Sequence, residues 1–303
     1  MNKLMLVVLT GVLLAGCAQQ PTTSITHVYA FGDEQSDMGK CIDLVKEAID
    51  QGQADPIEVP EIFNLKVQDR YVGRLTNGPV AVEVLADRLR VPLTDYAVCM
   101  AMSDHYTLLP SAVFDNTGLL GQIDQFEKDL NGKEADPNAL YTIQIGGTDL
   151  FHSGTSNTAT TVISNIATAI RRLAELGAKH ILVGNAFNMS KFPGFIGMGI
   201  ARTAEEYQTL FNETLPGELE TLAEELNVDI EIFDITAVEN SIQSHPENYG
   251  ITNLTEPCTH LGSGDGVTDI CTNPDAYYYW GYFYPTRHVH EILGEAIAEQ
   301  VSK

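Results

Sequence analysis

Basic side chains are scarce in this sequence. Of its 303 residues, 17 are lysine or arginine and 41 are aspartate or glutamate, which gives a formal net charge of -24 at pH 7. Proteins that bind nucleic acid use lysine and arginine to neutralise phosphates, so this charge excludes nucleic acid as a partner. It also excludes attachment to an anionic lipid surface by charge.

The N-terminus lacks a hydrophobic run long enough to cross a membrane. The apolar stretch from Leu4 to Leu14 follows Lys3. It is about half as long as a spanning helix, which needs about 20 residues to cross a hydrocarbon core of roughly 30 Å. A short apolar run behind a basic residue is typical of a secretory leader. We therefore expect an exported protein.

The end of this leader, Leu14-Ala15-Gly16-Cys17, resembles the bacterial lipobox, in which the cysteine is acylated and becomes the first mature residue. The resemblance implies a leader over residues 1–16, a lipidated tether over residues 17–24, and a membrane anchor on Cys17. Two or more acyl chains anchor a protein stably. Because aspartate does not follow Cys17, the resemblance implies an outer-membrane lipoprotein, on either its periplasmic or its surface side.

Helical patterns alternate with short apolar runs through the rest of the chain. Apolar residues between Ile163 and Leu173 have helical spacing and precede Gly177, a typical helix terminator, and residues 180–183 form the next apolar run. Such alternation predicts an α/β fold with a mainly parallel sheet between helices. Since no linker or repeat divides the chain, we expect one three-layer α/β/α domain over residues 25–303.

The most informative segment runs from Phe31 to Gly39, with the sequence FGDEQSDMG. It follows a short apolar run that begins at Ile25 and is typical of a buried strand. The segment has the frame of a serine-hydrolase nucleophile turn, but Glu34 stands where the serine is expected. Alone, this is weak evidence, because glycine and aspartate mark ordinary turns.

Further segments add specificity, since they recur in the order of the sequence blocks of the SGNH hydrolases. They are GRLTNG at 73–78, DYAVCMA at 95–101, IGGTD at 145–149 and YWGYFYPT at 279–286. The chain therefore resembles the Gly-Asp-Ser-Leu esterases and lipases, particularly the secreted bacterial phospholipase and haemolysin branch. This resemblance covers roughly residues 25 to 300 and implies a flavodoxin-like topology.

The chain departs from the family at each position where the resemblance places chemistry. Glu34 replaces the nucleophilic serine, and the block-two glycine, an oxyanion donor, falls at Cys99 or Met100. The other changed positions are Thr148 for the oxyanion asparagine, Gly281 for the triad aspartate and Tyr284 for the triad histidine.

These departures remove groups that ester hydrolysis by this route requires. The reaction needs a hydroxyl, an imidazole that takes its proton, and a carboxylate that orients the imidazole. A tyrosine, with a pKa near ~10, is a poor base at neutral pH, and a carboxylate at position 34 would oppose the developing oxyanion. We expect no efficient serine-type catalysis and no intact catalytic residue.

Other polar groups near these positions have structural interpretations. The family resemblance implies that Ser36 and Asp37 cap the following helix. His288 and His290 are expected on a solvated helix face, and residues two apart do not share a face, which disfavours a metal pair. Asp33 and Asp149 offer oxygen ligands for calcium or magnesium, but we favour loop-stapling roles for both. We therefore expect neither a metal nor a cofactor.

Four cysteines remain once Cys17 is assigned to the lipid, an even number in an exported chain. The haemolysin resemblance implies a disulfide between Cys258 and Cys271. Cys41 and Cys99 both lie near the expected strand ends, and either a bridge or two buried thiols is compatible with the sequence.

The candidate pocket consists of residues expected at the strand ends. They are Asp33, Glu34, Met100, Gly146, Asp149, Trp280 and Tyr284. The aromatic run at 277–284 could stack on a ligand, but we favour core filling. The sequence favours a non-catalytic binding or scaffold lipoprotein, with a glycan, lipid or protein as the possible ligand of the old cleft. The alternative is a carboxylic-ester hydrolase of the lipase or phospholipase type that uses non-standard residues.

Overall fold

The computed structural model describes residues 25–52, 73–109, 111–260 and 270–303. The predicted leader, the tether and Cys17 lie outside the described residues. Within the described part of the chain, no helix is both long and apolar enough to cross a membrane.

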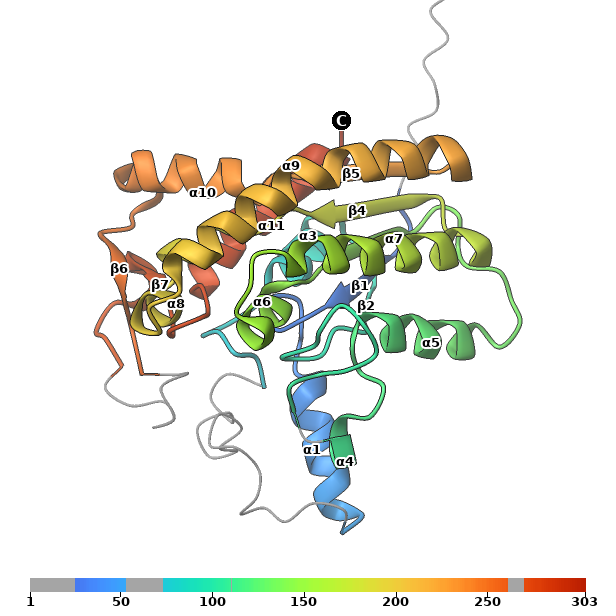
Figure 1. Ribbon diagram of the computed structural model, residues 1–303, viewed down its shortest axis with the longest axis horizontal. Helices are drawn as coiled ribbons and strands as arrows, with labels where there is room; N and C mark the ends of the chain where they lie inside the picture. The colour runs from blue at the N-terminus through green and yellow to red at the C-terminus, as the bar shows by residue number, and fades with distance from the viewer. Residues whose placement is uncertain (1–24, 53–72, 110, 261–269) are drawn as a thin grey trace, which may run out of the picture.

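A five-stranded parallel sheet forms the centre of the molecule (Figure 1). Its strand order is β2-β1-β3-β4-β5, the flavodoxin-like order that the resemblance implies. The strands are β1 (Val28–Gly32), β2 (Leu93–Asp95), β3 (Leu140–Gln144), β4 (His180–Gly184) and β5 (Asp229–Phe233). Because all pairs are parallel, the carboxyl ends of the strands meet at one edge, where ligands of such sheets bind.

Helices cover both faces of this sheet (Figure 1). One layer contains α5 (Leu119–Leu130), α7 (Thr158–Leu176) and α9 (Ala201–Leu226), and the other contains α3 (Ala81–Leu89) and α11 (Arg287–Val301). The remaining helices are α1 (Lys40–Asp50), α4 (Ser111–Phe114), α6 (Gly147–Ser153), α8 (Pro193–Gly197) and α10 (Ile235–Ser244), with short 3-10 turns η2 (Met189–Lys191), η3 (Pro246–Tyr249) and η4 (Pro274–Ala276). The predicted three-layer α/β/α fold is confirmed.

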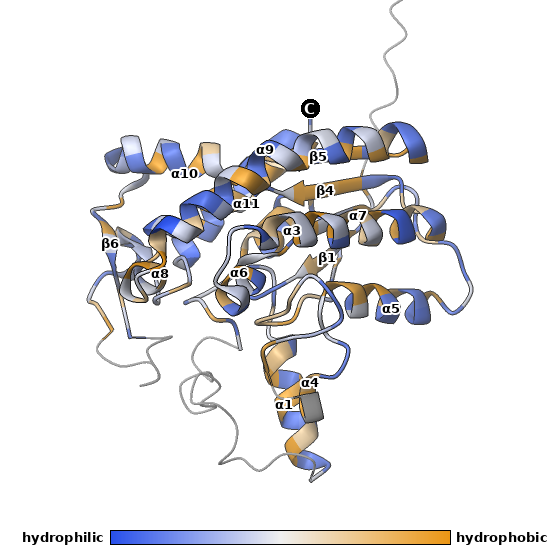
Figure 2. Ribbon diagram, in the orientation of Figure 1, coloured by the Kyte–Doolittle hydropathy of each residue, from blue (hydrophilic) through white to orange (hydrophobic). Residues whose placement is uncertain are grey.

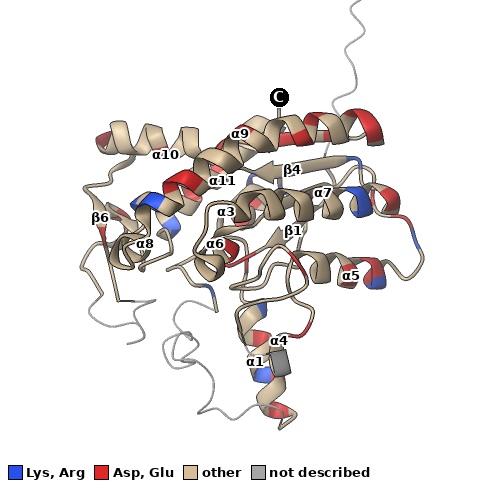
Figure 3. Ribbon diagram, in the orientation of Figure 1, with Lys and Arg blue, Asp and Glu red and all other residues tan. Residues whose placement is uncertain are grey.

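Each outer helix buries an apolar stripe and exposes charge. In α9, Ala204, Tyr207, Phe211, Leu215 and Leu219 recur every three or four residues and are buried, which is the spacing of one helix face. Figure 2 shows the same division between apolar strands and mixed helices. Figure 3 shows that acidic residues are spread over the outer helices.

Aromatic rings anchor the sheet to α5. Phe31 of β1 stacks on Tyr96 with ring centroids 5.2 Å apart, and Phe126 of α5 meets both rings edge-on. Such pairs add about 0.5–1.5 kcal/mol each beyond the area they bury. They fix the position of β1 and therefore of the turn that follows it.

Two disulfides brace loops next to this edge. The predicted Cys258–Cys271 bond is present. It lies beside a second, two-stranded sheet of β6 (Asn253–Pro257) and β7 (Tyr277–Tyr279). Cys41 and Cys99, for which the sequence left two possibilities, also form a disulfide. This bond joins α1 to the loop that follows β2.

Glycine allows β1 and β3 to approach closely at the same edge. Gly32 ends β1 with φ +144°, and a Cβ there would lie 1.9 Å from the carbonyl oxygen of Gln144 in β3. No other residue fits this turn without moving the strand. Gly32 thereby brings Asp33 and Glu34 directly over the end of β3.

Candidate functional site

The site forms where segments after four strands converge. Glu34 follows β1, Met100 lies in the loop after β2, and Thr148 begins α6 after β3. Tyr284 follows β7 of the small sheet. Glu34, Met100, Thr148 and Tyr284 all line one cavity. The structure therefore brings together four of the positions that were expected at the strand ends.

The carboxylate of Glu34 accepts a hydrogen bond from the backbone N–H of Met100, with an N to Oε2 distance of 2.9 Å. Met100 has a left-handed backbone, with φ +55°, and the hydroxyl of Thr107 holds its carbonyl group at 2.8 Å. Burial raises the pKa of Glu34, while this N–H and that of Glu34 itself act in the opposite direction. The loop thus presents a fixed N–H to a carboxyl group.

Asp33 adds a second carboxyl group to the same corner. It is almost fully buried, and its side chain accepts a hydrogen bond from the Gln35 N–H at 3.1 Å. Burial and the neighbouring Glu34 raise its pKa well above the usual range, because two carboxylates in one site repel each other. Its backbone carbonyl accepts the N–H groups of Ser36 and Asp37. Asp33 therefore staples the turn after β1, as predicted.

Tyr284 is a buried, neutral phenol. Burial raises its pKa well above 10, and the carboxyl groups of Glu34 and Asp33 act in the same direction. A phenol of this kind does not accept a proton at neutral pH. Its backbone carbonyl accepts the N–H groups of Trp280 and Gly281, at 2.8 and 3.2 Å, and closes the turn between β7 and α11.

Asp149 has a structural role behind the cavity. Its carboxylate accepts the backbone N–H and the hydroxyl of Ser103, and the Asn165 amide donates to the same hydroxyl. Ser103 is fully buried. These bonds staple the loop after β2 to α6 and α7, which confirms the predicted loop-stapling role. Asp149 is not among the residues that line the cavity.

The cavity has a volume of about 150 Å³ and is open to solvent on one side. Its wall is mostly apolar and aromatic. The lining includes, besides the residues above, Gly146, Phe151, Phe187, Met189, Phe192, Phe195, Tyr207 and Phe283. Gly146 has φ +119°, and a Cβ there would lie 2.5 Å from the hydroxyl of Tyr207, so glycine leaves room for that ring.

Trp280 was predicted in the pocket, and the structure places it elsewhere. Its side chain is fully buried in a separate apolar cluster with Cys41, Cys99 and Cys258. The aromatic run therefore divides: Tyr278, Tyr279 and Trp280 fill the interior, while Phe283 and Tyr284 line the cavity. The turn that the Tyr284 carbonyl closes with Trp280 and Gly281 separates the two groups.

The expectation of a solvated face for His290 was wrong. His290 is buried, its Nδ1 has no hydrogen-bond partner among the described residues, and burial lowers its pKa to about 4. His288 is partly exposed, and its Nε2 lies 2.7 Å from the Tyr249 carbonyl oxygen. Because α11 lies against α3, and His290 lines a small cavity together with Thr142 and Leu182 of the sheet, the face that carries His290 is an interior face.

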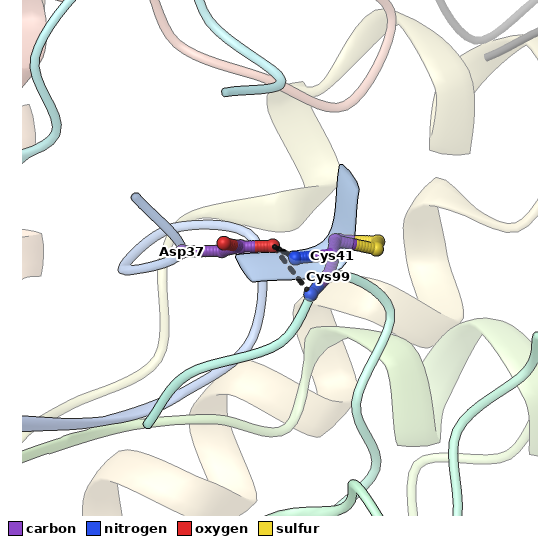
Figure 4. Close-up of side chains that lie close together, drawn as sticks. All are labelled: Asp37, Cys41 and Cys99. Atoms are coloured by element: carbon purple, nitrogen blue, oxygen red, sulfur yellow. Dashed lines mark hydrogen bonds between the residues drawn. A yellow bond between two sulfur atoms is a disulfide. The ribbon is translucent and has the colours of Figure 1, made fainter. Parts of the chain in front are cut away.

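Asp37, Cys41 and Cys99 are close enough to resemble a metal site (Figure 4). The two sulfur atoms are bonded to each other, and the Asp37 carboxylate is hydrogen-bonded to the backbone N–H groups of the same two cysteines. It accepts hydrogen bonds from Gly39 and Lys40 at 2.7 Å and from Cys99 at 2.9 Å. The Asp37 carboxylate therefore holds the first N–H groups at the start of α1 and clamps the loop after β2.

Much of the cavity wall was missed from the sequence. Phe187, Met189, Phe192 and Phe195 lie between β4 and α9, and Tyr207 lies on α9. The cluster of aromatic residues directly after a predicted strand was the available signal, since such loops lie at the ligand-binding edge.

The fold and the site define a class: a doubly wound α/β protein whose strand-end loops form a cavity around the position of a hydrolase nucleophile. The family model described as GDSL-like Lipase/Acylhydrolase matches residues 28–297, and the chain belongs to this family.

Curated relatives agree with this assignment. A thermolabile hemolysin of Vibrio parahaemolyticus is 23% identical over 93% of this chain and 65% of its own length. The GDSL esterase/lipase LTL1 of Arabidopsis thaliana is 24% identical over 93% of this chain and 89% of its own length. The chain thus spans just under two thirds of the hemolysin. Among solved structures, a lipolytic G-D-S-L family protein of Veillonella parvula matches with a TM-score of 0.45 and 12% identity, over 92% of this chain and 99% of its own.

Proposed function

We propose that this protein is a non-catalytic member of its family that binds a small ligand in the cavity at the strand ends. The observation that carries the proposal is the bond between the Glu34 carboxylate and the Met100 N–H. In a hydrolase of this family, an N–H of this loop would stabilise the oxyanion, and here a carboxylate occupies it.

The reaction would also lack its other groups. Gly281 carries no side chain to orient a base, and the phenol of Tyr284 takes no proton at neutral pH. A carboxylate nucleophile at position 34 would give an anhydride, which is an uphill product. Loss of a single oxyanion donor costs about 10²- to 10³-fold in rate. This loss of rate would come in addition to the losses caused by the missing nucleophile and the missing base.

The cavity supports binding in place of catalysis. It remains open, is mostly apolar and contains a few polar groups at one end, which is the usual composition of a small-molecule site. The proposal includes an anchor: acylation of Cys17 would hold the domain at the outer membrane. The lipobox-like sequence Leu14-Ala15-Gly16-Cys17 supports this part.

A second candidate is an ester hydrolase that works with unusual residues. Membership of a family of lipases and acylhydrolases favours it. Hydrolysis of p-nitrophenyl butyrate and of phosphatidylcholine by the full chain separates the two candidates. We expect no turnover from the wild type, from Glu34→Ala, or from the surface control Glu220→Ala. Turnover above roughly 1 s⁻¹, an ordinary enzyme rate, that Glu34→Ala abolishes and Glu220→Ala retains would establish the hydrolase instead.

A further inference from the structure

We propose that the cavity binds a hydrophobic primary amine in its ammonium form, with the head group at Glu34 and Gln35 and the apolar body among the phenylalanine rings. This inference rests on the proposed binding function and names its ligand class.

The polar end of the cavity is rich in hydrogen-bond acceptors. The Oε1 atom of Gln35 is buried and has no hydrogen-bond partner among the described residues, and Gln35 lines both this cavity and a smaller one that His290 also lines. Its Nε2 faces the carbonyl oxygen of Phe283 at 3.5 Å, so a flipped amide would place two oxygens against each other. The orientation therefore leaves an acceptor free for a ligand. A buried acceptor without a partner is costly, and a donor on the ligand removes that cost.

The ionisable side chains at this end of the cavity are acidic. Asp33 and Glu34 both line the cavity, and none of the described residues that line it is lysine, arginine or histidine. The Oε2 atom of Glu34 is bonded to Met100, and the carboxyl group keeps acceptor capacity at Oε1. An anionic head, such as a fatty-acid carboxylate, would meet two carboxyl groups without a counter-ion. An ammonium group supplies both the positive charge and the N–H donors.

The rest of the wall accommodates an apolar body and favours a cation nearby. Phe283 meets Phe151 and Phe195 edge-on, each with ring centroids 5.5 Å apart, and it packs against the backbone of α8 at Gly194. Rigid rings bury an apolar chain at little entropic cost, and their faces attract a cation. The hydroxyl of Tyr207 is also buried and has no hydrogen-bond partner in the part of the chain that the structure describes, so it adds a polar contact in the cavity.

A matched ligand series tests the head group. Isothermal titration calorimetry of the full chain carrying Cys17→Ser, which lacks the predicted acylation site, would compare hexylamine, 1-hexanol, hexanoate and hexyltrimethylammonium at pH 7.5. We expect hexylamine to bind at least tenfold more tightly than each of the others. Glu34→Gln and Gln35→Met should each weaken hexylamine at least fivefold and leave 1-hexanol within twofold, whereas the surface control Glu220→Gln should change neither.

Every other result of these titrations would contradict a specific part of the proposal. Equal or tighter binding of 1-hexanol or hexanoate would overturn the amine and leave the binding function intact. Equal binding of hexyltrimethylammonium would overturn the requirement for N–H donors. Failure of all four probes to bind at millimolar concentration would overturn this inference, and continued absence of binding with longer and aromatic probes would overturn the proposed function. Unfolding curves confirm that each variant is folded.

Discussion

The Oε2 atom of Glu34 lies 2.9 Å from the backbone nitrogen of Met100. One acidic side chain at the end of β1 thus binds the N–H that the loop after β2 directs into the cavity. The Glu34 carboxylate stands where the family has its nucleophilic serine. Its negative charge also takes the place of the oxyanion that attack by the serine would generate. Restoring the family's chemistry therefore requires more than one substitution.

The triple variant Glu34→Ser, Gly281→Asp and Tyr284→His rebuilds the nucleophile, orienter and base, but it leaves Thr148 in the cavity wall. We expect its kcat on p-nitrophenyl acetate to be about 10²- to 10³-fold below that of a quadruple variant that also carries Thr148→Asn, because one oxyanion donor has that effect. Equal rates in the two variants would mean that Thr148 does not limit the site.

Glu239 makes stability depend on pH. Burial raises its pKa from 4.5 to about 7, against the hydrogen bonds from Tyr278 and Asn188. A raised carboxyl pKa gives stability that is fully present below about pH 4.5 and is lost as the pH rises through 7. The shift corresponds to about 3 kcal/mol.

Glu239→Gln keeps the shape of the protonated carboxyl group and cannot ionise. We expect it to stabilise the protein by about 2–3 kcal/mol relative to wild type at pH 8 and by less than about 1 kcal/mol at pH 5, measured by urea unfolding. Asp37 and Asp95, whose pKa values burial raises to about 6 and about 8, titrate in both proteins and cancel in the difference. A pH-independent difference, or one that also occurs in Glu220→Gln, would contradict the assignment to Glu239.

The two disulfides should differ in their effect on stability. Cys41–Cys99 closes a sequence separation of 58 residues, and Cys258–Cys271 closes one of 13. Loop-closure entropy predicts losses of about 4 and about 3 kcal/mol when each pair is replaced by alanine. Thermal unfolding of the two double variants gives the comparison, and a larger loss for the shorter loop would show that native contacts outweigh loop entropy.

The anchor can be tested separately from the cavity. Cys17→Ser should release the protein from the membrane fraction or leave it unprocessed, and the wild type should incorporate a palmitate analogue. Replacing another cysteine pair, Cys258 and Cys271, leaves the label unchanged if acylation is confined to Cys17. A wild-type protein that takes up no label would refute the lipobox interpretation.

Local patterns predicted most of the fold. The helix that ends before Gly177 and the strand at residues 180–183 are present where periodicity and terminators placed them. These features depend on neighbours in sequence, which a single chain displays directly.

Features that depend on packing could not be predicted in the same way. The pairing of Cys41 with Cys99 depends on how α1 meets the loop after β2, and the burial of His290 depends on which face of α11 contacts α3 and the sheet. The position of Trp280 depends on the turn that the Tyr284 carbonyl closes after β7, and on the packing of that turn against Cys41, Cys99 and Cys258. Sequence placed the site at the strand ends, but only tertiary contacts decide which neighbours line it.

The Asp37 carboxylate holds N–H groups on both sides of the Cys41–Cys99 bond. The start of α1 and the loop after β2 are therefore joined twice, once by the disulfide and once through the Asp37 carboxylate. Neither of these two connections involves Glu34 or Tyr284. The loop after β2 therefore keeps two connections to α1 even when Glu34, which also binds this loop, is replaced. In such an arrangement, side chains in the cavity can change over successive substitutions while the surrounding architecture stays intact.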